Sequence, residues 1–551
     1  MNTNAVSLIE NNCVAEKTKD RYNSGAYQFI IWLYKSQDIA PDLLRPRLLV
    51  QIGELEDRAD LTESKKKKAI RELIVTGWLK KMDRKDPQRC PVDVSILTYD
   101  IAALYMSQKK DGDGNYFSKS HYCGARSCII NLFTMSNVSP PPGFRERMQT
   151  LMKGFKRTIV SQKVERGETL EEGKEVMSFA CYELLCKKFF EGEKDEYNFA
   201  HLFLTLEWNL IARSDNVVNL AIGDLEWNDD ALICYLKRTK TDQEGNNGKT
   251  PYHLYSNPLS PHLSVVLALG NYLLTNPGVI KENGMLFPAQ YQYNRYSNVL
   301  QRVVKENEAE FARIGVKIGS IGTHSARKGA ASLAASGCTI APAMASICNR
   351  AGWKMGGTRD KYIRYENAGD QFLGRTLTGI NSLSKEFSVS PPFFHLPQQE
   401  IEGVDELIRT HIVGASECSA KLFEVIRMSF ASVVYHRDHM HTHLHKKNRL
   451  RSHPLFNNLP EVCVCVLSFD ILNKQCCKRC FRCGGVCLIS NMLVKKINES
   501  IVVYCFVVFF IGIIAPHIHC SSFLLIFAKT NQRYVFVCFL FLYDCKRTMS
   551  V

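Results

Sequence analysis

The alternation of apolar and polar positions predicts helices in the first third of the chain. Apolar residues recur every three or four positions with charged residues between them, a pattern typical of amphipathic helices. The pattern occupies three stretches: residues 16–37, 61–85 and 145–168. Thr62 stands where the second helix needs an N-cap, and a proline run breaks the chain before the third. We therefore predict a helical domain with its linker over residues 1–168.

After residue 168 the pattern changes to helices that flank a β-hairpin. The stretches 231–238 and 250–256 predict two strands joined by a turn that contains Gly and Asn. Helical periodicity predicts further helices over residues 261–275, 298–313, 323–336 and 340–351, and a proline break closes the section near residue 397. The predicted fold class is therefore mostly α with a small β-hairpin or sheet: a helical domain, then a mixed α/β domain over residues 169–397.

The C-terminal part divides into two segments of different character. Residues 398–460 contain a predicted helix and a histidine-rich run, and we interpret them as an accessory segment. Residues 461–551 hold eleven of the 21 cysteines and the uncharged stretch 501–528, which is long enough to cross a bilayer. A proline, two histidines and two serines interrupt that stretch, so a membrane partner is disfavoured. We interpret this tail as non-native translation.

The cysteines at 476–487 and the histidines at 436–453 invite a zinc interpretation. No second, properly spaced Cys/His pair follows the cysteines, so we predict no metal site. The first 460 residues hold only ten cysteines, and no apolar signal segment opens the sequence. We therefore expect an intracellular protein.

The charge balance points to a polyanionic partner. Lys and Arg number 70 against 55 Asp and Glu, a net charge of +15, which suits nucleic acid or an acidic membrane surface. The basic positions of the second and third helices are the candidate DNA contacts. They are Lys65, Lys66, Lys67, Lys68, Arg145, Arg147, Lys153, Lys156 and Arg157.

One ordered set of residues suits attack on a phosphate. A tyrosine that attacks a phosphodiester needs guanidinium donors for the developing charge and a general acid for the departing oxygen, but no metal or ATP. The chain supplies, in order, Arg213, Lys240 at the hairpin tip, His324, Arg327, Trp353 and, nine residues later, Tyr362. Each residue alone has an ordinary structural explanation, on a solvated helix face or in a core. The ordered set carries the prediction.

This set resembles the tyrosine recombinases of the phage integrase family. The segments TKTDQEG, THSARKGA and NRAGWKMGGTRDKYIRYENAGDQFLGR look closest to the crypton-like recombinases of eukaryotic mobile elements. The resemblance implies that Arg213 and Arg327 hold the scissile phosphate and that Lys240 is the general acid. It also implies that His324 assists proton transfer or phosphate contact, that Trp353 replaces a second histidine and that Tyr362 is the nucleophile.

Three details qualify the match. Tyr365 is twelve residues from Trp353, so the family spacing favours Tyr362. Lys328 stands where many bacterial relatives have histidine. Ser-Asp-Asn follows Arg213, which leaves Asp215 as the nearest candidate for a buttressing carboxylate.

The resemblance further implies a function. A core-binding domain over residues 1–168 and a tyrosine recombinase catalytic domain over residues 169–397 would close around double-stranded DNA. They would cleave and rejoin it through a 3′-phosphotyrosine, without a cofactor or small-molecule substrate, as a homotetramer that integrates or excises a mobile element in the nucleus. The alternatives are a catalytically inactive DNA-binding protein of this fold, a topoisomerase-like enzyme, and a membrane-anchored protein with an incidental set of motifs.

Overall fold

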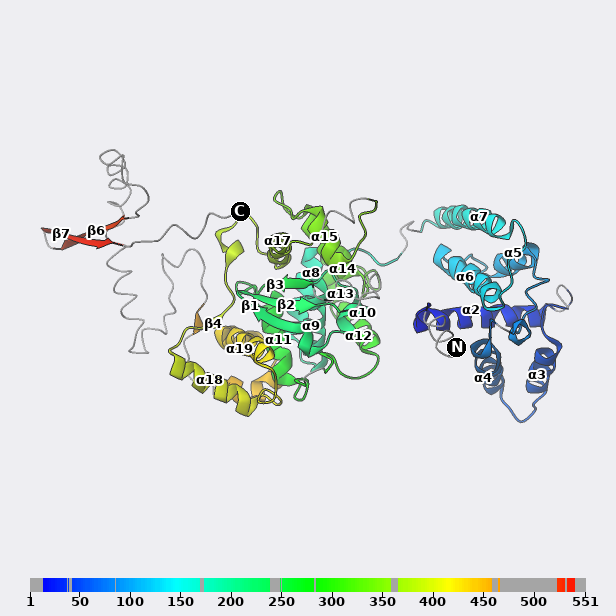
Figure 1. The fold of residues 1–551 in the computed structure, drawn as a ribbon, viewed down its shortest axis with the longest axis horizontal. Coiled ribbons are helices and arrows are strands. Elements are labelled where there is room, and N and C mark those ends of the chain that lie inside the picture. The colour runs from blue at the N-terminus through cyan, green and yellow to red at the C-terminus, as the bar shows by residue number, and fades with distance from the viewer. Residues whose placement is uncertain are drawn as a thin grey trace, which may run out of the picture. The chain divides into compact units, whose positions relative to one another are not determined.

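The computed structural model describes residues 13–36, 38, 42–84, 86–168, 173–237, 248, 250–281, 284–357, 365–457, 464–465, 523–530 and 533–540. The chain divides into two compact units, Met1–Gly173 and Lys174–Val551. Most of the described residues are helical, and one three-stranded antiparallel sheet lies in the second unit (Figure 1). The predicted fold class, mostly α with a small sheet, is confirmed.

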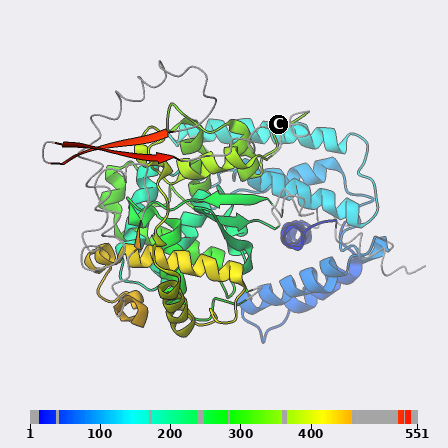
Figure 2. The same cartoon turned by 60° about the vertical axis from the view of Figure 1, so that its left-hand side comes forward.

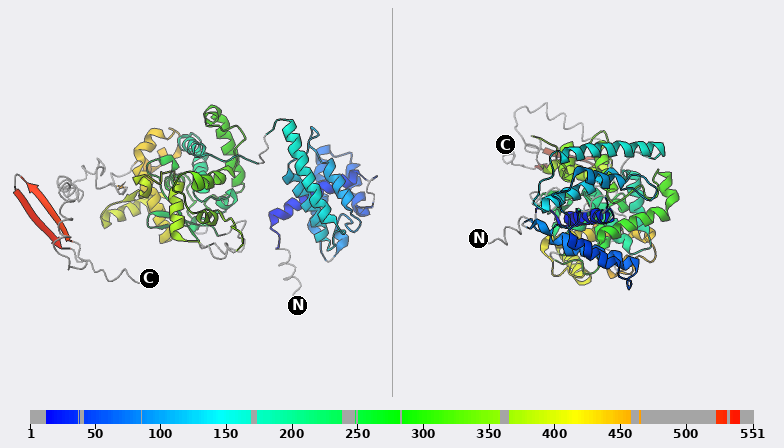
Figure 3. Two further views of the ribbon diagram at one scale, coloured as in Figure 1. Left: turned by 90° about the horizontal axis from the view of Figure 1, so that it is seen from above. Right: turned by 90° about the vertical axis from the view of Figure 1, so that its right-hand side faces the viewer.

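The first unit is a bundle of helices. They are α2 (Glu16–Lys35), α3 (Pro46–Glu56), α4 (Glu63–Glu72), α5 (Tyr99–Gln108), α6 (Lys119–Met135) and α7 (Phe144–Glu165). Helix α2 buries Phe29, Ile30 and Leu33, the apolar stripe of its sequence, and packs on α6. Helix α7 lies along α5 and α6, as Figure 3 shows in cyan. The three helices predicted from periodicity are confirmed as α2, α4 and α7.

The second predicted helix is shorter than its apolar pattern. Helix α4 begins after Thr62, as expected, and ends at Glu72. A π-helical turn over Leu73–Trp78 and a 3₁₀ turn over Leu79–Lys81 continue the chain. Ile74 and Leu79 stay buried through these turns, so the apolar pattern persists although the α-helix does not.

Most of the second unit is helical. Its helices are α8 (Phe179–Glu191), α9 (Glu196–Asn209), α10 (Ser214–Val218), α11 (Val265–Thr275), α12 (Gln292–Glu306), α13 (Glu308–Arg313), α14 (Ser325–Ser336), α15 (Met344–Ala351), α17 (Asn367–Leu377), α18 (Gln398–His411), α19 (Ala420–Tyr435), α20 (Arg437–His443) and α21 (Pro454–Asn457). Every residue of α9 except Glu196, and every residue of α11, is buried, as expected for helices at the centre of a domain. Helix α9 contacts α8, α11, α12 and α14, so it forms the centre of the unit.

The sheet of the second unit contains the predicted hairpin and one further strand. Strands β1 (Leu225–Asn228), β2 (Ala231–Tyr235) and β3 (Pro251–Leu254) pair antiparallel in that order. The sequence did not predict β1, because its four residues, Leu-Glu-Trp-Asn, are too few for a clear alternation. Asp229, with a φ of 51°, forms part of the tight turn between β1 and β2.

The segment after residue 397 belongs to the same core. Helix α19 packs on α11 and β1, and buries Val425, Ile426 and Phe430 there (Figure 2, yellow). The structure also describes two antiparallel pairs: β4 (Phe393–Phe394) with β5 (Val464–Cys465), and β6 (Phe523–Thr530) with β7 (Arg533–Leu540). None of the helices that the structure describes is both long and apolar enough to span a membrane. The first part of the uncharged stretch, residues 501–522, lies outside the described residues.

Candidate functional site

Arg213 lies in a strained connection between two helices. The sequence pattern predicted that Arg213 lies near the end of an apolar helix. In the structure α9 ends at Asn209, and Arg213 is the residue directly before α10. Between them Ile211 has a φ of 47°, a left-handed conformation that is a genuine outlier for a β-branched residue. The Ala212 amide donates to the Glu207 carbonyl at 3.0 Å and closes the turn. The Arg213 side chain is half-buried, and its enclosed Nη1 has no hydrogen-bond partner within the described residues.

Arg327 holds this connection from the first turn of α14. Its side chain is buried, with Nη1 donating to the Ile211 carbonyl at 2.9 Å and Nη2 to the Ala351 carbonyl at 2.5 Å. These two hydrogen bonds tie the strained turn to the end of α15. Neither Arg327 nor Arg213 forms an ion pair with a carboxylate in the part of the chain that the structure describes.

The two arginines place positive charge together. Burial, and next the positive charge of Arg213, lower the pKa of Arg327 to about 10. A guanidinium with that pKa stays protonated at neutral pH. The site therefore holds two cations close enough to repel each other, an arrangement that a bound anion would stabilise.

Trp353 covers one side of this pair. Helix α15 ends at Ala351, and the C-cap residue Gly352 has a φ of 63°, the left-handed conformation in which glycine is favoured at a helix C-terminus. The chain then turns so that the Trp353 ring centroid lies 5.3 Å from Cζ of Arg327, within cation–π distance. The ring is 41% exposed, so it forms the edge of the site rather than part of the core.

The remaining predicted catalytic residues are placed differently. His324 occupies the N-cap position of α14, three residues before Arg327, but its side chain is exposed whereas that of Arg327 is buried. Lys240 and Tyr362 lie outside the described residues. The structure therefore brings Arg213, Arg327 and Trp353 together, with His324 at the start of the same helix as Arg327.

Sequence reasoning missed a buried carboxyl group at this site. Glu207, on α9, is fully buried, and the Ser214 hydroxyl, next to Arg213, lies 2.5 Å from its Oε1 and 3.0 Å from the Thr323 carbonyl oxygen. Burial raises the pKa of Glu207 to about 8, although Ser214, Tyr296 and Arg327 oppose the shift. Glu207 is therefore mostly protonated at neutral pH, and it links α9, the Arg213 turn and the residue before His324.

A signal for Glu207 was present in the sequence. It is the only charged residue in the apolar run 199–212, where a carboxyl group has to be buried and hydrogen-bonded. Asp215, the residue proposed from the sequence for a buttressing role, lies exposed on α10.

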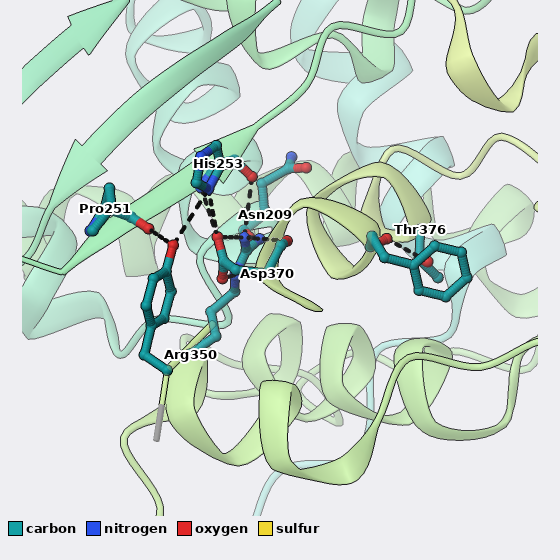
Figure 4. Close-up of polar contacts among 8 residues, drawn as sticks. Asn209, Pro251, His253, Arg350, Asp370 and Thr376 are labelled. Carbon is teal, nitrogen blue, oxygen red and sulfur yellow. Dashed lines mark hydrogen bonds and ion pairs between the residues drawn. The ribbon is translucent and has the colours of Figure 1, made fainter. Parts of the chain in front are cut away.

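A second buried arginine is fully paired, and the sequence analysis did not single it out. Arg350, on α15, donates from Nε to Oδ1 of Asp370 at 2.8 Å and from Nη1 to the Asn209 carbonyl at 2.9 Å (Figure 4). Its Nη2 lies 2.6 Å from Oδ2 of Asp370, and the same oxygen accepts from the His253 amide at 2.9 Å. Burial alone would raise the pKa of Asp370, but Arg350 and His253 outweigh it and hold that pKa below its ordinary value.

Tyr365 is attached to the same network. Its hydroxyl donates to the Pro251 carbonyl at 2.5 Å, which fixes the phenol against β3. Burial, and next the charge of Asp370, raise its pKa. A hydroxyl that is already donating, with a raised pKa, is a poor nucleophile.

The predicted DNA contacts of the first unit fall into two groups. On α7, Arg145, Lys153, Lys156 and Arg157 are exposed and make no ion pair or hydrogen bond with another described residue. Arg147 projects from another side of that helix, where it pairs with Asp100 at 2.7 Å and stacks over Tyr99.

On α4, the lysine run divides in the same way. Lys65, Lys67 and Lys68 are exposed. Lys66 instead donates to the Glu56 carbonyl at 2.5 Å and lies 3.7 Å from Glu63. Its ammonium group is therefore already engaged.

The histidine-rich run shows no metal cluster. His439 and His443 stack with ring centroids 4.0 Å apart, and His436 is buried. No group of three or more His, Cys, Asp or Glu side chains among the described residues is placed to hold a metal ion. The cysteines at 476–487 lie outside those residues.

Comparisons with known proteins give structural similarity alone. No family model matches the sequence, and no curated protein matches it. One similar solved structure is the XerH site-specific recombinase bound to difH substrate, at 12% identity and a TM-score of 0.33, covering 64% of this chain and 93% of that one. An FLP recombinase–Holliday junction complex aligns at 14% identity and a TM-score of 0.31, covering 56% and 78%. Similarity at this level carries no argument about activity, which has to come from the residues themselves.

Proposed function

We propose that this chain cleaves and rejoins DNA through a covalent 3′-phosphotyrosine, as a recombinase that integrates or excises a mobile element. The observation that carries the proposal is the pair Arg213 and Arg327. Two guanidiniums lie close together at a partly exposed site, one has an enclosed donor without a partner, and no described carboxylate pairs with either. Such a site favours the binding of an anion. The family resemblance implies that this anion is the scissile phosphate, held by the two arginines.

The donors suit a phosphodiester. A guanidinium carries five N–H donors, of which the carbonyl groups of Ile211 and Ala351 account for two on Arg327. The remaining N–H groups of Arg327 and the half-buried Arg213 guanidinium can share the non-bridging oxygens. Both would stabilise the additional charge of the five-coordinate phosphate, the term that usually contributes most to such reactions.

The bonds and protons balance without a cofactor. The Tyr362 oxygen forms a bond to phosphorus as the bond from phosphorus to the 5′-oxygen breaks. Lys240 gives the departing oxygen a proton, and His324 helps to remove the proton of the tyrosine. The energy of the broken bond is retained in the phosphotyrosine, so the reverse reaction can rejoin a strand.

The reaction also defines the assembly and its setting. Exchange between two duplexes requires four strand cuts, and one tyrosine for each cut implies a homotetramer on DNA. We place this activity in the nucleus, where the DNA of a eukaryotic mobile element resides.

A nicked duplex tests the proposal. Cleavage close to the nick releases a short fragment, so the covalent adduct accumulates and survives denaturing electrophoresis. We expect an adduct from a pool of nicked duplexes of varied sequence, in the presence of EDTA. If the protein binds these duplexes but forms no adduct, it is a non-catalytic DNA-binding protein. Strand transfer between two sites would separate a recombinase from a topoisomerase-like enzyme.

A further inference from the structure

The first unit contains a basic groove that the sequence did not predict. A cavity of about 360 Å³ is bordered by Arg126 and Asn131 of α6, by Arg145 and Gln149 of α7, and by Tyr22 of α2. Ser127 and Thr134 also border it, with their hydroxyls donating to the Cys123 and Ile130 carbonyls, and none of the Asp and Glu residues that the structure describes lines the cavity. Among the described residues, the lining therefore offers two positive charges and the side-chain amides of Asn131 and Gln149, with no negative charge to offset them.

The two arginines of this groove are unengaged. Neither Arg126 nor Arg145 makes an ion pair or hydrogen bond with another residue that the structure describes. Elsewhere in the same unit, Arg45 pairs with Asp93 and Arg147 with Asp100, each between 2.7 and 2.9 Å. Two guanidiniums from different helices that meet in a concave site without a counterion suit the oxygens of a phosphate group.

The surroundings favour a polymer over a small anion. Lys153 and Lys156 follow Arg145 at spacings of eight and three residues, which places all three on one side of α7. At 1.5 Å per residue this row extends about 16 Å along the helix. Each strand of a duplex carries one phosphate for about every 3.4 Å of helix axis, so the row can contact several of them.

We propose that this groove holds a backbone phosphate of DNA, with Arg126 and Arg145 as its ligands. The inference rests on the proposed function. It adds a DNA contact surface in the first unit, whereas the arginine pair of the proposed cleavage site lies in the second. Arg126 escaped sequence analysis because it stands alone in Cys-Gly-Ala-Arg-Ser-Cys, without the neighbouring basic residues that indicate a DNA contact. Only the packing of α6 on α7 brings it to Arg145.

The salt dependence of binding tests this contact. Affinity of the full chain for a random-sequence duplex is measured by fluorescence anisotropy at several KCl concentrations. Each phosphate contact contributes about 0.9 to the slope of log affinity against log salt. Because both arginines hold the same phosphate, we expect Arg126→Gln with Arg145→Gln to lower that slope by about 0.9, and Arg126→Gln alone to lower it by part of that amount.

A matched control removes the same charge elsewhere. Arg89 pairs with Asp86 at 3.2 Å and lies outside the groove, so Arg89→Gln should leave the slope unchanged. Thermal melting of each variant shows whether it is folded. If Arg126→Gln with Arg145→Gln is folded and keeps the wild-type slope while adduct formation persists, the groove proposal is wrong and the proposed function stands. Competition by inorganic phosphate without an effect of Arg126→Gln on DNA would also overturn it, since the groove would then be a small-anion site. If the wild type has no salt-dependent affinity for DNA, both proposals fail.

Discussion

Arg350 and Arg327 are both buried arginines of the second unit, and they differ in whether a carboxylate counterion lies beside the guanidinium. Arg350 donates to Asp370 and to backbone carbonyls, and its charge is balanced inside the protein. Arg327 donates to two carbonyls and faces the charge of Arg213. A buried charge with its counterion present serves the structure, whereas one without a counterion leaves room for an anionic ligand. The comparison makes predictions that separate stability from chemistry.

The largest expected effect is on stability, from Arg350→Ala. Removing the guanidinium leaves Asp370 buried and short of its partner, which costs about 3–5 kcal/mol. Urea unfolding should show a lower midpoint at an unchanged slope. A loss below about 1 kcal/mol would mean that Arg350 is not the structural arginine of the pair.

The next effect is on cleavage, from Arg213→Ala. Losing one donor to the transition state should cost about 3–4 kcal/mol, roughly a hundred- to a thousand-fold in rate. Stability should change little, because the side chain is half-buried and a like charge beside Arg327 is removed. Rates of adduct formation and urea midpoints are measured on the same preparation. If Arg213→Ala lowers stability as much as Arg350→Ala does, the distinction between the two arginines is wrong.

Glu207 provides a pH test of the same site. Its pKa of about 8 in the folded protein exceeds the ordinary value of about 4.3 in the unfolded chain. The folded state therefore binds more protons between these values, and the stability that Glu207 contributes is complete below pH 4.3 and falls as the pH rises towards 8. Glu207→Gln keeps an acceptor for Ser214 without the charge, so it should remove this dependence. Equal slopes of stability against pH for the variant and the wild type, between pH 5 and 8, would contradict the assignment.

The smallest effect is expected from Trp353→Ala. Its ring contributes a cation–π contact with Arg327 worth about 0.5–1 kcal/mol, so adduct formation should slow by about two- to five-fold. Trp353→Phe keeps an aromatic face and should recover part of the rate. A loss as large as that of Arg213→Ala would show that Trp353 contacts the reacting phosphate directly.

The sequence predicted what depends on neighbours along the chain. Helices α2, α7 and α19 and the hairpin of β2 and β3 follow from local periodicity. The members of the predicted catalytic set came from family spacing. The Asp370–His253 contact joins residues 117 positions apart, and no local pattern marks it. Glu207 was visible as a charge in an apolar run, but its link to Ser214 and the Arg213 turn required the fold.

The most direct test of the account is to identify the tyrosine that becomes attached to DNA. Tyr365 is fixed by its hydrogen bond to Pro251, and its pKa is raised, whereas the spacing from Trp353 assigns the attack to Tyr362. Mass spectrometry of the trapped adduct should find the phosphotyrosine at Tyr362. Tyr362→Phe should then bind DNA without forming the adduct, and Tyr365→Phe should still form it. A phosphotyrosine at Tyr365, or an adduct from Tyr362→Phe, would contradict the account.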